Sequence, residues 1–296
     1  MRKLALLACL ALAAGGPVST ASADPVWVPP QGTFHASFAY TQAIWDQYLQ
    51  GDGTSVALPG EVDQYEFTTY AEYVPIENLS FDITFPIVFT QRKFVFLETD
   101  LNGQIIGASL GPDGEVRDVD TNKGLGDVTL GAKYIFWDRG ASIGVRPYVK
   151  LPGTYATGEL ANAPGDGQTD LGLSLLAGTY IPSIRTYFRG SLSFVLRTGA
   201  PANQIDLMIE PGVNLTDKLN ARFMYQFTAQ NGGTDFDYYS TANYYPGNKE
   251  NTHRIGGGLT YRATDLLGIF GLYQQSVAGR NTANVKAFTI GLDFSF

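Results

Sequence analysis

The sequence predicts an all-β fold, a transmembrane antiparallel up-and-down β-barrel of about twelve strands. Three observations carry this prediction: an export signal at the N-terminus, a series of alternating segments separated by turns, and a final strand that ends on Phe296. Side chains of a strand alternate faces with period 2. In residues 284–296, one face therefore carries Phe288, Ile290, Leu292, Phe294 and Phe296, and the other carries small or polar residues.

The N-terminal residues have the pattern of a cleaved signal peptide. A basic start (Arg2, Lys3) precedes an apolar run over 4–14 and an Ala-Ser-Ala site at 21–23. The run is too short to cross a bilayer as a helix. We expect residues 1–23 to be removed and residues 24–296 to form one barrel domain. A buried N-terminal helix and a lipoprotein cleavage box ending at Cys9 remain alternatives.

Composition limits the partners. Without Arg2 and Lys3, 18 basic residues face 28 acidic ones, so the mature net charge is −10. This charge argues against nucleic acid and anionic lipid as partners. Cys9 lies in the signal and is the only cysteine, so the mature chain has no disulfide and no Cys metal site. Thirty-four glycines and seventeen tyrosines favour strands and turns over helices.

The alternating segments are each long enough to cross a bilayer as a tilted strand, which needs about 9–11 residues. Tight connections alternate with mostly long ones, as in barrels with short periplasmic turns and longer external loops. An even strand number leaves both ends on the periplasmic side. The predicted strands are 33–45, 63–74, 79–92, 125–137, 141–151, 169–181, 184–197, 204–215, 219–230, 252–262, 266–276 and 284–296.

Charges gather on one face of these strands and apolar residues on the other. A soluble lipocalin-like barrel would place the apolar face inside. The signal, the aromatic ending, the strand lengths and the loop asymmetry favour the inverted arrangement, with an apolar surface in lipid and a polar lumen. An open sheet edge in lipid would leave backbone groups unsatisfied, so closure is expected.

Two interpretations of the lumen are open. Acidic and basic strands could form opposed charged walls of a conduit for a small dipolar or charged solute. Alternatively, neighbouring strands could neutralise each other in a salt-bridged, mostly filled interior, since buried charges need partners. The candidates for lining the lumen are Glu66, Asp82, Lys133, Arg146, Lys150, Arg185, Arg189, Arg197, Asp206, Glu210, Arg222 and Arg254.

Two external loops are notable. Residues 93–124 contain strand-like pieces at 93–97 and 104–110, which could extend a hairpin above the membrane or fold inward as a constriction. Extension is the commoner outcome. Residues 231–251 concentrate aromatic side chains that could contact a solute at the mouth or belong to the aromatic girdle. These residues are Phe236, Tyr238, Tyr239, Tyr244 and Tyr245.

Catalytic motifs are sparse, so we expect no enzyme, no cofactor and no metal site. His35 and His253 are the two histidines. A serine follows His35 at position 37, but the Asn that orients the His in outer-membrane phospholipases is missing from this pattern. Residues 118–129 partly follow a calcium loop, but Lys123 replaces its required Gly.

Three central segments resemble the outer-membrane family labelled "MetA-pathway of phenol degradation". They are 123–134 (KGLGDVTLGAKY), 146–152 (RPYVKLP) and 165–173 (GDGQTDLGL). Here Leu-Pro-Gly-Thr at 151–154 replaces the usual Leu-Pro-Thr-Gly. The final strand separately resembles the ending that the outer-membrane assembly machinery recognises. These resemblances imply a barrel and the uptake of small solutes, among them aromatic or hydrophobic ones.

We therefore expect a monomeric channel in the outer membrane of a Gram-negative bacterium, passing small solutes without energy. Its expected partners are outer-membrane lipid, the solute and the assembly machinery, which would bind the C-terminal strand. The alternatives are a structural or adhesive barrel with a closed lumen and a lipid-modifying enzyme.

Overall fold

The computed structural model describes residues 26–49, 52–94, 96–99, 105–109, 117–154, 167–198, 203–231 and 250–296. Its strands are β1 (Phe34–Leu49), β2 (Ser55–Ile76), β3 (Leu79–Phe94), β4 (Phe96–Thr99), β5 (Ile105–Ser109), β6 (Arg117–Leu125), β7 (Val128–Asp138), β8 (Ser142–Leu151), β9 (Asp170–Ile181), β10 (Thr186–Arg197), β11 (Asn203–Asn214), β12 (Leu219–Asn231), β13 (Asn251–Arg262), β14 (Leu267–Arg280), β15 (Thr282–Ala283) and β16 (Lys286–Ser295).

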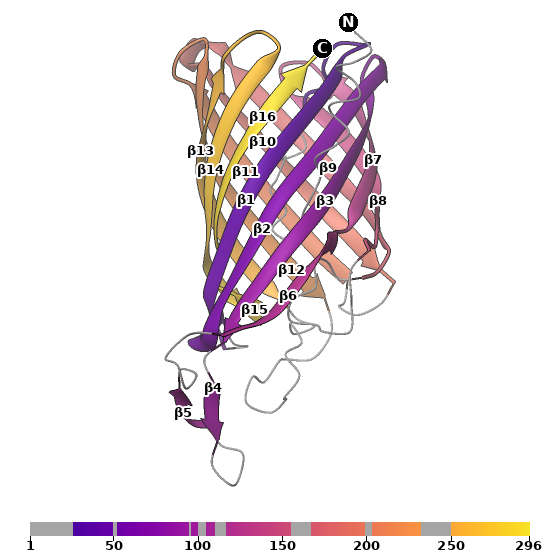
Figure 1. The fold of residues 1–296 in the computed structure, drawn as a ribbon. Coiled ribbons are helices and arrows are strands. Elements are labelled where there is room, and N and C mark those ends of the chain that lie inside the picture. The colour runs from indigo at the N-terminus through magenta and orange to yellow at the C-terminus, as the bar shows by residue number, and fades with distance from the viewer. Residues whose placement is uncertain are drawn as a thin grey trace, which may run out of the picture.

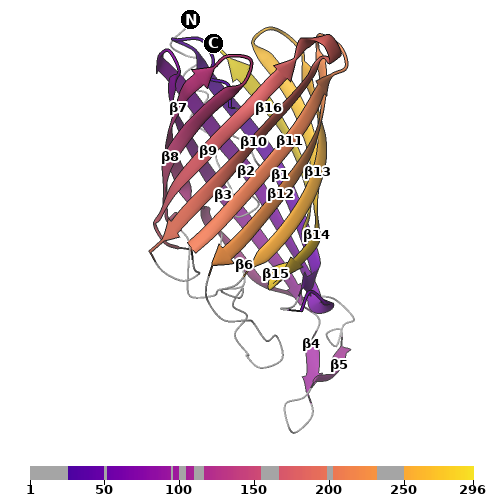
Figure 2. The ribbon, with the colours of Figure 1, turned by 180° about the vertical axis from the view of Figure 1, so that it is seen from behind.

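The strands close into an antiparallel barrel. Neighbours in sequence are neighbours in the sheet, and β1 pairs with both β2 and β16, which leaves no open edge in the wall. β6 and β7 together form one wall position beside β3, and β15 continues the pairing of the last strand with β1. The prediction of a closed twelve-stranded barrel is confirmed (Figures 1 and 2).

The seam joins the first and last strands as the sequence predicts. Phe34 and Phe296 exchange two backbone hydrogen bonds, of 3.1 and 2.9 Å, and their ring centroids lie 6.5 Å apart. The pairing runs from His35 opposite Ser295 to Ile44 opposite Lys286. Strand β1 therefore begins at the same end of the barrel at which β16 ends, which is the periplasmic end in the predicted orientation.

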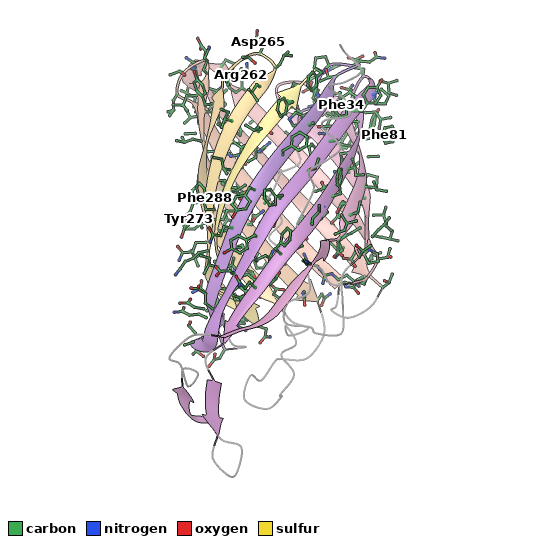
Figure 3. The ribbon with its side chains drawn as sticks, viewed as in Figure 1. Phe34, Phe81, Arg262, Asp265, Tyr273 and Phe288 are labelled. Carbon is green, nitrogen blue, oxygen red and sulfur yellow. The ribbon has the colours of Figure 1, made fainter. Side chains whose placement is uncertain are left out.

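The outer surface is apolar and the inner surface is polar. On β16, Phe288 is 53% exposed whereas Thr289 is 1% exposed. The same alternation on β9 exposes Leu173 and Leu175 and buries Ser174. Figure 3 marks Phe81, Tyr273 and Phe288 on the outer surface. Exposed apolar side chains around a closed barrel are the signature of a lipid-facing band.

One side of the barrel extends beyond the rest. Strands β1, β2 and β3 have 16, 22 and 16 residues, against 10 to 14 in β8 to β14. The hairpin of β4 and β5 projects past the end opposite the termini of the barrel wall (Figures 1 and 2). The described parts of loop 93–124 thus extend the wall instead of folding into the lumen, as expected.

The predicted strand 184–197 begins later than expected. Residues Pro182–Ile184 form a 3₁₀ turn, and Arg185 adopts a left-handed conformation with φ of 53°. The strand starts only at Thr186. Among the described residues, no helix has the length and apolar character to cross a membrane.

Candidate functional site in the barrel lumen

Two of the inward ion pairs cross one intervening strand. Lys133 Nζ on β7 lies 2.7 Å from Glu72 Oε1 on β2, and both side chains are at most 1% exposed. Strand β3 runs between them. Glu72 also accepts a hydrogen bond from Tyr70 Oη, 3.1 Å from its Oε2. A buried ion pair of this kind must be complete, because either charge alone would carry a large desolvation cost.

A second pair crosses β7 in the same way. Arg146 on β8 donates from Nε and Nη2 to both carboxylate oxygens of Asp82 on β3, over 2.9 and 2.5 Å. Gly131 on β7 lies directly beneath this pair. A Cβ there would come within 2.6 Å of Arg146 Nε and 2.7 Å of Asp82 Oδ2. The absence of a side chain at Gly131 therefore allows the two long side chains to meet along the wall.

The remaining pairs follow the next strands around the barrel. Arg189 on β10 makes a bidentate contact with Glu210 on β11, at 3.0 and 2.9 Å. Lys150 Nζ lies 2.6 Å from Asp170 Oδ2, and Arg197 Nε lies 3.7 Å from the same oxygen. These ion pairs thus neutralise the charges of nearby strands. For these residues, the alternative of opposed acidic and basic walls is wrong.

The other candidates differ in their surroundings. Asp206 accepts hydrogen bonds from Gln204 and Thr228, and Glu66 accepts one from Thr68. Arg222 and Arg254 form no ion pair with any described residue, and the Nε of each is buried without a hydrogen-bond partner.

Arg185 requires a correction. Its guanidinium is half-exposed in the turn before β10 and pairs at 2.5 Å with Asp217 in the next turn at the same end. The left-handed conformation at this position breaks the strand alternation on which the lumen prediction rested. Arg185 belongs to the periplasmic rim.

Large inward aromatic rings lie against the wall over glycines of the adjacent strand. Tyr148 covers Gly172 and Tyr187 covers Gly212, and a Cβ at either glycine would overlap the ring. Arg146 and Arg189 then pack over the Tyr148 and Tyr187 rings, at 5.0 and 5.9 Å. Rings held flat on the wall take up less of the bore than rings that project into it.

Residues 26–31 cross the periplasmic mouth of the lumen. Val26 is 1% exposed and packs with Ile135 of β7 and Leu176 of β9. The ring of Trp27 meets that of Tyr187 edge-on, with centroids 5.8 Å apart. This contact is with β10, six positions around the wall from β1, into which the segment leads. The segment therefore spans the bore at this level.

Sequence reasoning did not identify this segment. The apolar run Val26, Trp27, Val28, followed by two prolines, lies between the cleavage site and the first strand. Its residues do not alternate as in a strand, so the pattern does not predict where the segment lies. The apolar run itself could have indicated that the segment is buried.

The two histidines face different environments. His35 Nε2 lies 3.8 Å from Asp293 Oδ1, on the inner face. His253 Nδ1 is 2.8 Å from Tyr225 Oη, and its ring stacks near Phe227 on the outer face. No described serine is hydrogen-bonded to either ring. The lipid-modifying alternative thus gains no catalytic pair from the described residues.

Two groups of predicted features lie outside the described residues. They are the signal peptide, 1–23, and the loop aromatics Phe236, Tyr238, Tyr239, Tyr244 and Tyr245. Both stay predictions.

Comparison with protein families identifies the family of this barrel. The family described as "Putative MetA-pathway of phenol degradation" matches residues 45–290. The chain belongs to this family. The match covers nearly the whole barrel, well beyond the central segments on which the resemblance was first based. Among curated proteins there is no match.

Solved structures show the same fold. The chain is similar to the COG4313 outer membrane channel from Pseudomonas putida F1, with a TM-score of 0.69 and 12% identity over 92% of this chain and 98% of that one. It is less similar to the translocator domain of the autotransporter NalP from Neisseria meningitidis (0.49, 11% identity, 92% and 91% covered) and to CymD, a monoaromatic hydrocarbon channel (0.48, 9%, 90% and 89%). This member of the MetA-pathway family therefore has the fold of an outer-membrane β-barrel.

Proposed function

We propose that this member of the MetA-pathway family is a passive channel for small aromatic or hydrophobic solutes in the outer membrane of a Gram-negative bacterium. The observation that supports this proposal is a closed barrel with a lipid-facing apolar surface and a polar interior, in a family named for phenol degradation. We propose that it acts as a monomer and that the assembly machinery recognises the strand ending at Phe296.

The lumen suits an uncharged or weakly charged solute. Its carboxylates are neutralised by nearby Lys and Arg, so the wall carries little net fixed charge at those places. Aromatic rings and the buried cluster of Met208, Met224 and Leu272 add apolar surface among the polar groups. Such a mixed surface offers weak contacts at several levels, and weak multiple contacts favour passage over retention.

Planar-bilayer recording tests the proposal directly. The purified barrel should open discrete conductances, and proteoliposomes should admit benzyl alcohol or phenol faster than a sugar of similar mass. In the living cell, deletion of the gene should slow growth on single aromatic carbon sources and leave growth on succinate unchanged. A barrel that never conducts, even with residues 26–31 removed, would overturn the channel proposal.

A second candidate, a structural barrel with a closed lumen, is favoured by the segment at residues 26–31. Val26 and Trp27 bridge the periplasmic mouth, and buried ion pairs fill part of the bore above them. This candidate differs from the channel in one respect: release of the segment should not produce a conductance.

A further inference from the structure

Arg222 is distinguished from the other lumen arginines at the periplasmic level by the absence of a carboxylate partner. Arg146 and Arg189 each make a bidentate contact with an acid. Arg222, on β12, makes no ion pair with any described residue, and its Nε is buried without a hydrogen-bond partner. Arg222 is part-buried, and a guanidinium nitrogen buried without a partner is costly, so its neighbours indicate what the side chain is arranged to bind.

Glycines flank Arg222 on both adjacent strands. Gly212 of β11 and Gly258 of β13 are its direct partners in the sheet. The Tyr187 ring lies over Gly212, and Arg222 Nε lies 3.3 Å from where a Cβ of Gly258 would be. The absence of side chains at these two glycines lets the Tyr187 ring lie flat on one side of Arg222 and lets the Arg222 side chain itself lie along the other.

The Phe270 ring contacts this guanidinium, and two further aromatic rings lie on the wall beside it. Its central carbon lies 5.7 Å from the centroid of Phe270 on β14. Tyr187 reaches toward it from β10, and Trp27 of the N-terminal segment packs edge-on against Tyr187. The Tyr187 hydroxyl also lies 3.5 Å from Asn220 Oδ1, two residues before Arg222 on the same face. Met208, Met224 and Leu272 form an apolar cluster on β11, β12 and β14, and the two unbranched methionine side chains can repack around a guest.

We propose that Arg222, with Tyr187 and Phe270, forms a binding station in the lumen for a small arene that carries an acidic group, a carboxylate or a phenolate. The guanidinium fork takes the anionic oxygens, in the manner that makes arginine the common partner of carboxylates. The arene lies among Phe270, Tyr187 and Trp27, where edge-to-face and stacked contacts are available. This inference rests on the proposed function, because a station in the lumen serves a solute only if solutes pass.

The station also explains why other arginines of the wall are paired with acids whereas Arg222 is not. A guanidinium paired with an acid is already satisfied, whereas Arg222 keeps its fork free for an anion that arrives. The nearby carboxylate of Glu210 accepts a hydrogen bond from the Tyr187 hydroxyl over 2.7 Å and is neutralised by Arg189, so it leaves the Arg222 fork free. An anion without a ring would gain only the charge contact, and a ring without a charge only the aromatic contacts. Binding should therefore require both.

Calorimetry of the full barrel in detergent tests the station without any need for conductance. The probes are benzoate, acetate as the charge without the ring, and benzyl alcohol as the ring without the charge. We expect benzoate to bind at least about tenfold more tightly than either, since a hydrogen bond to a charged group has about that worth. Arg222→Gln should weaken benzoate binding about tenfold or more and leave benzyl alcohol within about twofold.

Matched variants complete the design. Arg262→Gln removes the same charge from the exposed periplasmic end of the neighbouring strand β13 and should leave benzoate binding unchanged. Phe270→Leu should bring the affinity for benzoate close to that for acetate. If Arg222→Gln does not fold, as judged by heat-modifiable gel mobility, Arg222→Lys keeps the charge without the fork and should still lose most of the benzoate preference.

The outcomes separate the station from the channel. Equal binding of benzoate and acetate, or equal benzoate binding by wild type and Arg222→Gln, would overturn the station even if the barrel conducts. Benzoate binding that depends on Arg222 in a barrel that never conducts would support the station and overturn the channel.

Discussion

The segment at residues 26–31 should act as a constriction whose release opens the lumen. Its described attachments to the far side of the bore are the buried Val26 side chain and the ring of Trp27 against Tyr187. Fully burying a valine side chain stabilises by about 1.5–3 kcal/mol. An edge-to-face aromatic pair adds about 0.5–1.5 kcal/mol beyond its area burial. The double variant Val26→Ser, Trp27→Ala should therefore weaken docking of the segment by about 2–4.5 kcal/mol.

Since about 1.4 kcal/mol corresponds to a factor of ten, this loss shifts the ratio of released to docked segment by about 30- to 1,500-fold. Single-channel recording should show this shift as a higher open probability, with the conductance of each opening unchanged. Gln31→Ala is the matched control, because the Gln31 side chain donates a hydrogen bond to the exposed carbonyl of Pro75 at the rim, over 3.0 Å.

A second perturbation reaches the same contact from the wall. A Cβ at Gly178 would overlap Val26 Cγ1 and lie 3.3 Å from Trp27 Cζ2, so Gly178→Ala should release the segment without altering it. If both changes leave the open probability at the wild-type value while the barrel conducts, the segment is no constriction. Burial of Val26 and Trp27 would then have no part in gating the lumen.

Three further predictions concern the wall. Lys133→Met leaves the buried carboxylate of Glu72 without a partner and should lower the free energy of unfolding in urea by about 3–5 kcal/mol. Adding Glu72→Gln should restore part of this loss. Wild-type stability of the single variant would contradict the buried pairing. Gly212→Val displaces the ring that covers this glycine and should cost about 1–3 kcal/mol in the same titration. Arg189→Gln leaves the charge of Glu210 uncompensated, so the reversal potential in a KCl gradient should shift toward that of a cation-selective channel. An unchanged reversal potential would show that this pair does not line the ion path.

Strand identity and facing were predictable because both are local properties. The alternation in 284–296 fixes which side chains share a face, and it needs no knowledge of a partner strand. The pairing of this strand with β1 then follows from closure, since lipid tolerates no free edge. The start of β2 was missed by eight residues: it begins at Ser55 instead of Asp63. Pro59 and Gly60 lie inside this strand because its pairing with β1 is irregular between Trp45 and Gln47, so Pro59 needs no ladder partner there.

The arrangement of the site was not predictable in the same way, because its contacts cross from strand to strand. Asp82 and Arg146 lie 64 residues apart in the chain, and a glycine on the strand between them decides whether they can meet. A list of inward charges gives the residue types but not these pairings. It therefore could not show that Arg222 is left without an acid. The unpaired guanidinium emerges only when the bonds of every neighbouring carboxylate have been assigned, and that assignment depends on the register of the whole wall.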